Sequence, residues 1–133
     1  MAMNRLPLEK RKQIIHLMVE GNGVNAISRL TGASKVTVLK LLEQAGAACM
    51  AHHDKAVRGV KASRVECDEI WSFNYCKKAK LATAKAAPEG AGDAWTWTAI
   101  DADSKLIVSY LIGGRDADAA QDFMHDVADR LAN

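Results

Sequence analysis

Three carboxylates lie within one short stretch of this sequence that is otherwise apolar and aromatic. Glu66, Asp68 and Glu69 belong to the run ECDEIWSF, part of a segment, 65–76, whose alternation predicts a β-strand. Because successive strand residues point to opposite faces, Glu66 and Asp68 share one face and Glu69 takes the other. Oxygen ligands on a rigid backbone are what Mg²⁺ or Mn²⁺ needs for phosphoryl transfer. Asp68 is therefore a candidate metal ligand, and the alternative is an acid that faces solvent on an edge strand.

A second stretch with functional spacing is ISRLTGAS, residues 27–34. Ser28 lies four residues before Gly32 and Val38 follows that glycine by six. This spacing predicts a helix-turn-helix, because the turn glycine adopts a conformation that is costly for a bulky residue. The second helix of such a motif enters the major groove by its N-terminal end. The residues that we expect to reach phosphates or base edges are Arg29, Ser34, Lys35, Thr37 and Lys40. The alternative is a three-helix bundle that serves only as a scaffold, with solvated lysines.

Charge divides the sequence into two unlike halves. Residues 1–64 hold 11 Lys and Arg against 4 Asp and Glu, whereas residues 65–133 hold 7 against 12. A basic half can meet phosphates and an acidic half can hold cations. The pattern indicates two domains with different partners.

The basic half predicts three short helices. The first begins near Pro7 and ends at Gly21-Asn22-Gly23, the second spans about 24–31, and the third reaches from the N-cap Ser34 to about Ala45. Helical spacing predicts that the inward side chains of the second and third helices are Ile27, Leu30, Val38, Leu41 and Leu42. Residues 47–64 show little periodicity and are expected to form a linker.

The acidic half predicts three antiparallel strands and a helix. The strands are expected over 65–76, 94–101 and 106–112, with a long loop over 77–93, and Asp116 or Asp118 is expected to cap the last helix. Apolar side chains on both faces of the first strand are typical of an interior strand. The predicted fold class is α+β, with a helix-turn-helix domain over 1–46, a linker over 47–64 and a second domain over 65–133.

The combination of ISRLTGAS, ECDEIWSF and WTWTAIDADSKLIVSYLIGGRD resembles the DDE transposases of bacterial insertion sequences, of the insertion-sequence-one type. In that family a helix-turn-helix precedes an RNase H-like domain whose first catalytic aspartate lies in a D-E-x-W motif. The matching residues here are Asp68, Glu69 and Trp71, so the resemblance implies that Asp68 is a catalytic, metal-binding carboxylate. It also implies DNA strand transfer with Mg²⁺ or Mn²⁺, and double-stranded element ends as the partner.

The family's second aspartate and its glutamate would follow Asn133. We therefore expect a C-terminally truncated or split transposase that retains only DNA binding, with metal binding weak or absent in this chain alone. It would act as a homo-oligomer or with a full-length transposase subunit. The alternatives are a helix-turn-helix regulator that represses the full-length transposase, and a small adaptor that dimerises through its sheet. Asp101 and Asp103 are expected to be turn residues rather than substitute ligands.

Composition excludes several other classes. The chain is 49% hydrophobic with a mean hydropathy of −0.12, which is typical of a globular protein. No apolar run approaches the ~18 residues of a membrane span, and the start MAMNRLPLEKRK lacks the apolar core of a secretory signal. We therefore expect a cytoplasmic location. Three widely spaced cysteines fit neither a disulfide framework nor a zinc knuckle.

Overall fold

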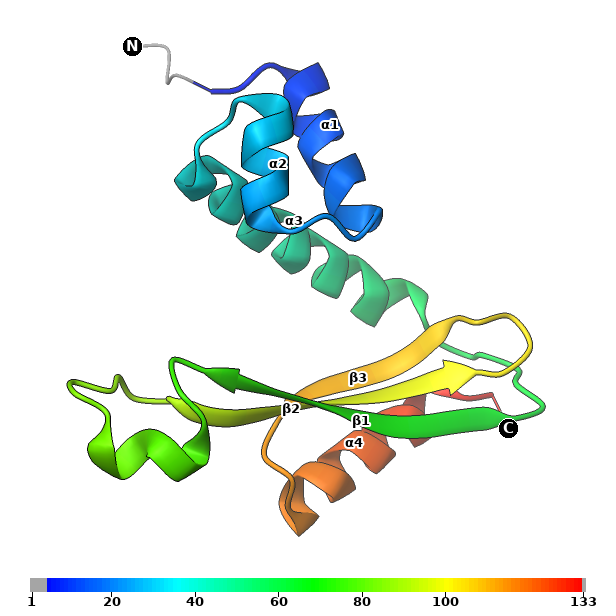
Figure 1. The fold of residues 1–133 in the computed structure, drawn as a ribbon. Helices are drawn as coiled ribbons and strands as arrows, with labels where there is room; N and C mark the ends of the chain where they lie inside the picture. The colour runs from blue at the N-terminus through cyan, green and yellow to red at the C-terminus, as the bar shows by residue number, and fades with distance from the viewer. Residues whose placement is uncertain (1–4, 133) are drawn as a thin grey trace. The chain divides into compact units, whose positions relative to one another are not determined.

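The computed structural model describes residues 5–132, and contacts divide the chain after Ala56 into an N-terminal and a C-terminal unit. The first four residues and Asn133, which the predicted domains include, lie outside the described residues. Helices make up the N-terminal unit, and a three-stranded antiparallel sheet with a helix makes up most of the C-terminal unit (Figure 1). The α+β class is therefore confirmed.

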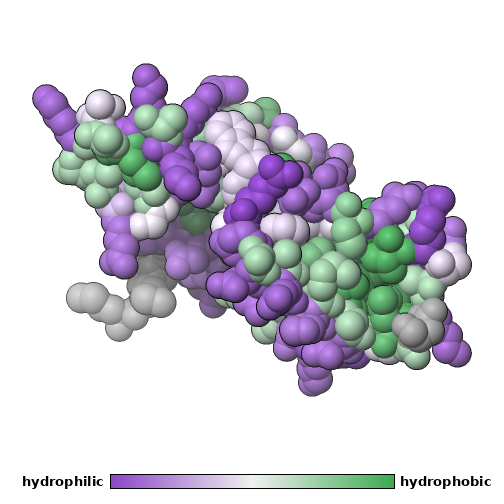
Figure 2. Space-filling view, turned by 90° about the horizontal axis from the view of Figure 1, so that it is seen from below, coloured by the Kyte–Doolittle hydropathy of each residue, from purple (hydrophilic) through white to green (hydrophobic). Residues whose placement is uncertain are grey.

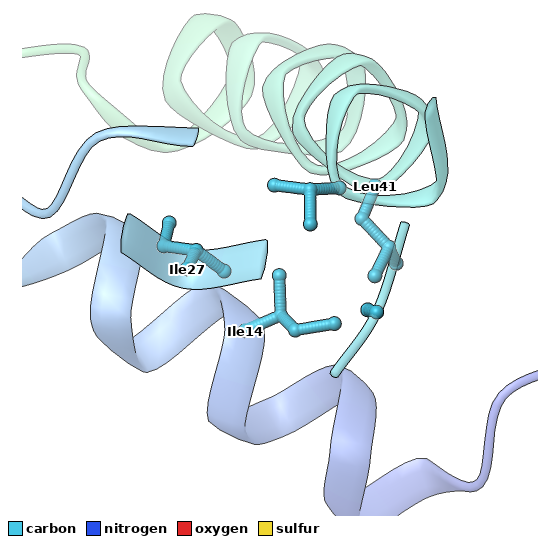
Figure 3. Close-up of a cluster of buried hydrophobic side chains, with 5 residues drawn as sticks. Ile14, Ile27 and Leu41 are labelled. Atoms are coloured by element: carbon cyan, nitrogen blue, oxygen red, sulfur yellow. The ribbon is translucent and has the colours of Figure 1, made fainter. Parts of the chain in front are cut away.

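The N-terminal unit consists of α1 (Leu8–Val19), α2 (Val24–Thr31) and α3 (Lys35–Ala56) around a small apolar core. Ile14, Ile27 and Leu41, one from each helix, point toward one another (Figure 3). Val38 and Ala33 complete the buried cluster. Leu30 and Leu42, which the sequence predicted to be buried, are exposed. The core between the three helices is narrow, so each helix buries one apolar stripe while the flanks of that stripe stay exposed.

The third helix is longer than the sequence predicted. Residues 47–56, expected as linker, continue α3 without interruption to Ala56. Nearly all of this stretch is exposed, so it has no apolar face to create a periodic pattern. Its alanines, methionine and lysine favour a helix by intrinsic propensity alone. The predicted linker over residues 47–56 was wrong because hydrophobic periodicity appears only where one face of a helix is buried, and this part of α3 is exposed on nearly all sides.

The remaining predicted linker also has a fixed place. Val60 forms a parallel bridge with Leu131, and its N–H donates to the Arg130 carbonyl over 2.9 Å. The Arg64 carbonyl accepts a hydrogen bond from Ala102 N–H over 2.9 Å. Residues 57–64 therefore belong to the C-terminal unit instead of spanning freely between domains.

The C-terminal sheet has the order β1-β2-β3, with β1 (Val65–Asn74), β2 (Gly92–Asp101) and β3 (Ile107–Gly113). The segment between β1 and β2 contains the short 3-10 helix η1 (Lys78–Thr83). Helix α4 (Ala117–Arg130) lies against one face of the sheet (Figure 1). Asp116 caps α4 by accepting a hydrogen bond from Ala119 N–H over 2.8 Å, which confirms one of the two caps that the sequence predicted.

The core of this unit lies between α4 and the strands. Phe123 and Val127 of α4 pack with Ala99 of β2, and the half-buried Trp97 ring lies 5.8 Å from the Phe123 ring, centroid to centroid. Green hydrophobic side chains gather toward the end of the unit where β1 begins and α4 ends (Figure 2). Leu131 and Val65 extend the core there.

Strand β1 lies at an edge of the described sheet, and β2 is the central strand. The expectation of an interior first strand is therefore not met within residues 5–132. Ile70, Trp71 and Phe73 are exposed, because β1 pairs with β2 on one side only and α4 packs against β2 and β3. Apolar residues on both faces of a strand thus did not guarantee burial.

Replacing either of two glycines of the N-terminal unit by alanine is predicted to change the free energy of unfolding, in opposite directions. Gly32 has a φ of +75°, whereas Gly46 lies inside α3, and an added Cβ would meet nothing within 4 Å at either position. Gly32→Ala should lower the free energy of unfolding by about 1–2 kcal/mol through backbone strain alone. Gly46→Ala should raise it by about 0.5–1 kcal/mol, because alanine has the better helix propensity.

Urea unfolding followed by helical circular dichroism measures both changes. Gly32→Asn serves as a control, since asparagine tolerates the left-handed region better than alanine. If Gly32→Ala were as stable as the parent, the turn would not require its positive φ.

Candidate functional site

The turn between α2 and α3 is held by bonds from small polar side chains. Gly32 adopts the left-handed conformation and ends α2, with its N–H donating to the Ser28 carbonyl. The Ser28 hydroxyl crosses the turn and donates to the Ala33 carbonyl over 2.7 Å. A residue without a hydroxyl at position 28 could not make this bond. The turn geometry therefore depends on Ser28 and Gly32 together, as their spacing predicted.

Ser34 immediately precedes α3, and its hydroxyl forms hydrogen bonds at the helix N-terminus. Its Oγ accepts a hydrogen bond from Thr37 N–H over 3.2 Å and lies 2.9 Å from Thr37 Oγ1. Position 34 is thus an N-cap, which satisfies one of the free N–H groups of the first turn. Both hydroxyls lie at the N-terminal end of α3, where Ser34 is exposed and Thr37 is half-buried.

The cationic residues predicted from the sequence lie around this turn. Arg29 is exposed in the last turn of α2, and Lys35 and Lys40 are exposed on the first half of α3. Lys10 has a structural contact instead, because its Nζ donates to the Thr31 carbonyl over 2.7 Å at the end of α2. Lys10 therefore stabilises the helices, whereas Arg29, Lys35 and Lys40 are exposed to a ligand.

Tertiary packing adds residues that the sequence argument did not select. Arg5 and Arg11, from the segment that enters α1 and from α1 itself, line a cleft together with Thr37, Lys40 and Gln44 of α3. Val36 and Leu39 are exposed on α3. Both arginines belong to the basic half of the sequence, but only the packing of α1 against α3 brings them beside Lys40.

Asp68 lies on β1, exposed, on the face of the sheet opposite α4. Its cross-strand partner is Thr98, and its Oδ1 accepts a hydrogen bond from Glu69 N–H over 2.8 Å. Glu66 shares the face of Asp68 but forms an ion pair of 3.0 Å with Arg64. Glu69 points to the other face, where Arg115 Nε lies 3.4 Å from its Oε1.

These donors do not by themselves fit a divalent cation. Within residues 5–132, no three His, Cys, Asp or Glu side chains come together in a group that could hold a metal ion. Asp68 is one carboxylate beside an acid that already has a cationic partner. Mg²⁺ has octahedral coordination, and proteins usually bind it through one or two carboxylates while water or substrate phosphates supply the other oxygens. Asp68 by itself therefore supports no metal-dependent catalytic step.

Asp101 is a turn residue, as the sequence predicted. Its carboxylate accepts hydrogen bonds from the Ser104 hydroxyl and from the N–H groups of Ser104 and Asp103. The hydrogen bond from the Ser104 hydroxyl is the main reason that the pKa of Asp101 lies below its ordinary value. The register places Asp101 opposite Val65, three pairs away from Asp68 and Thr98. Asp101 is thus committed to its own turn.

The three tryptophans differ in their surroundings. Trp97 contributes to the core and its Nε1–H donates to the Gly114 carbonyl over 3.0 Å. The Arg115 guanidinium carbon lies 4.9 Å from the ring centroid of the half-buried Trp95. Trp71 is exposed, with Lys77 Nζ 5.3 Å from its ring centroid. Cations therefore cover two of the three rings.

Together these elements define an α+β protein with a basic three-helix unit and a sheet-and-helix unit. Comparison with models of known families, with curated proteins and with solved structures finds no match. In residues 5–132 no helix combines the length and the apolar composition that crossing a bilayer requires.

Proposed function

We propose that this chain binds double-stranded DNA through its N-terminal unit, with α2, the turn and α3 acting as a helix-turn-helix. The observation that supports this best is the turn itself. Gly32 is left-handed, the Ser28 hydroxyl bonds across it, and Ser34 caps the next helix. This is the local geometry that lets two helices meet at a sharp angle with the second one exposed.

The charges around α3 agree with a nucleic-acid partner. Arg29, Lys35 and Lys40 are exposed near the turn, and Glu43 is the one acidic residue of the first two-thirds of α3. Lysine and arginine at such positions neutralise phosphates, while Thr37 and Ser34 offer hydroxyls to phosphates or base edges. The N-terminal half of α3 is therefore proposed to enter the major groove.

Within DNA-binding proteins, we propose a transposase of the insertion-sequence-one type. The support is the sequence resemblance, together with an exposed Asp68 on a strand that precedes two antiparallel strands and a helix. In this proposal the C-terminal unit is the beginning of an RNase H-like domain, and Asp68 would take part in metal-dependent strand transfer with groups that the described residues do not supply. The chain alone then retains DNA binding.

A helix-turn-helix regulator is the second candidate, supported by the same turn and by the pairing of Glu66 with Arg64. Metal-dependent nicking of a labelled duplex distinguishes the two. Nicking by the chain, alone or with added transposase subunits, that Asp68→Ala abolishes would favour the transposase. DNA binding with no Asp68-dependent nicking in any combination would favour the regulator.

The DNA-binding proposal is tested by removing the two exposed lysines of α3. Lys35→Ala combined with Lys40→Ala should weaken binding to a duplex of mixed sequence. It should also flatten the plot of log affinity against log salt by up to about 2, because each neutralised phosphate contributes about 0.9 to the slope. A fluorescence-anisotropy titration at several salt concentrations measures both quantities.

The matched control removes two exposed lysines from the C-terminal unit, Lys78→Ala with Lys80→Ala. That variant and Asp68→Ala should bind the duplex like the parent. Equal affinity and salt slope in all variants would show that α3 does not lie against DNA.

A further inference from the structure

A cleft beside α3 has a volume in the range of ligand sites. It has a volume of about 680 Å³ and lies between the segment that leads into α1 and the first half of α3. Leu6 and Leu41 supply its apolar part, and Thr37 and Gln44 add polar groups. Pockets for small ligands have volumes of roughly 300–1,000 Å³, so this cleft can receive a phosphodiester with part of its adjoining sugars.

The charge of the cleft selects an anion. Arg5, Arg11 and Lys40 line it, and among residues 5–132 no acid does. Glu9, the acid nearest to Arg11 in the sequence, forms an ion pair of 2.9 Å with Lys12. Three cations around one hollow repel one another unless an anion lies between them. The lining thus favours a ligand that carries negative charge.

Arg11 is held in a position suited to phosphate. Its Nε donates to the Leu6 carbonyl over 3.2 Å, which ties the guanidinium to the edge of the cleft. A guanidinium has five N–H donors, so four remain for the oxygens of a ligand. The planar fork of arginine matches the geometry of phosphate oxygens and can bind two of them at once.

Three lining residues of α3 connect the cleft to the proposed recognition helix. Thr37, Lys40 and Gln44 are spaced by three and four residues, so they lie on one side of α3. A DNA strand whose backbone passes through the cleft would therefore run along α3, the helix that we propose to enter the major groove. Contacts of this kind fix the register of a protein on DNA without reading its sequence.

We propose that this cleft binds a phosphate of the DNA backbone, with Arg5, Arg11 and Lys40 as its cationic ligands. The proposal rests on the proposed function, because it requires duplex DNA at α3. It assigns to the first helix and its leading segment a backbone contact that the sequence argument placed only on α2 and α3.

The test uses the full chain with Arg5→Gln and Arg11→Gln. A second variant, Arg5→Gln with Lys40→Gln, keeps the bond between Arg11 and Leu6 intact. Both should bind a mixed-sequence duplex roughly tenfold more weakly, with a salt slope flatter by about 1, the contribution of one phosphate. Lys55→Gln with Lys61→Gln removes the same charge from exposed positions outside the cleft and should change the slope less. Thermal unfolding by circular dichroism verifies that each variant is folded.

Two results would overturn the proposal while leaving the proposed function standing. One is parental affinity and slope in both cleft variants, while Lys35→Ala weakens binding. The other is a rise in unfolding temperature with inorganic phosphate, at constant ionic strength, that the cleft variants lose without any loss of duplex affinity; the cleft would then be a small-anion site. If the parent chain itself does not bind duplex DNA, the proposed function fails first.

Discussion

Phe123→Ala is expected to lower the free energy of unfolding of the C-terminal unit by about 3–5 kcal/mol. The Phe123 side chain is 1% exposed and is the largest fully buried one of its core, in which Ala99 and Val127 are the other buried residues. Truncation of a buried phenylalanine removes its transfer free energy and leaves a cavity that neighbours fill only in part. Small domains are stable by roughly 5–15 kcal/mol in total, so the loss is a large fraction of that stability.

Tryptophan fluorescence during urea unfolding measures this effect selectively. All three tryptophans of the chain lie in the C-terminal unit, and the Trp97 ring is in contact range of Phe123. Met124→Ala is the matched control, because Met124 is the next residue of α4 and is 52% exposed. It should shift the transition little. If Phe123→Ala left the fluorescence transition unchanged, α4 would not pack on the sheet as described.

Arg130→Met is the second change with a large expected effect. The Arg130 side chain is 7% exposed, and its Nε donates to Asp126 Oδ2 over 2.7 Å. Its Nη1 donates to the Val57 carbonyl over 3.2 Å, which ties α4 to the segment before β1. Breaking a buried ion pair costs roughly 3–5 kcal/mol. Asp126 keeps 36% of its side chain exposed, so we expect a smaller loss of about 2–3 kcal/mol.

The same contact predicts a dependence on acid. Burial raises the pKa of Asp126, but the hydrogen bonds from Arg130 and Ser109 and the positive charge of Arg130 outweigh it, so the pKa lies below the ordinary 3.8. The stabilisation is complete above that value and is lost as the pH falls through the lower pKa of the folded state.

Urea unfolding between about pH 6 and pH 2 tests both parts of the prediction. The difference in stability between the parent and Arg130→Met should be largest at pH 6 and should shrink below the ordinary pKa of aspartate. Asp101, whose pKa is also lowered, contributes equally to both proteins, so it cancels in the difference. A difference that stays constant down to pH 2 would contradict a role for the Asp126 charge.

Local patterns in the sequence were sufficient where a short-range interaction determines the structure. Gly32 adopts the positive φ that the turn spacing requires, and Ser34 and Asp116 cap α3 and α4. Each of these features involves residues within a few positions of one another, so its physical cause is contained in the segment itself. For the same reason the α+β class and the positions of the three strands could be predicted.

Burial could be predicted only in part, because it depends on what packs against each face. Helical spacing identified Ile27, Val38 and Leu41 correctly, yet Leu30 and Leu42 at the flanks of the same stripes are exposed. The alternation of β1 predicted a strand but not its place at the edge of the described sheet. Periodicity shows that a face is apolar, whereas the neighbouring element determines whether that face is covered.

The chemistry that this chain offers can be identified in its amino-acid sequence: a basic helical half with Lys35 and Lys40 beside a turn, and an acidic strand with Asp68. Which of these groups lie together depends on tertiary packing. Packing of α1 against α3 brings Arg5 and Arg11 to Lys40 around one cleft, although about thirty residues separate them in the chain. The sheet leaves Asp68 without such neighbours, because strand register sets its cross-strand partner as Thr98. Charge and turn geometry are local properties of a sequence, whereas a binding site depends on distances that only folding brings about.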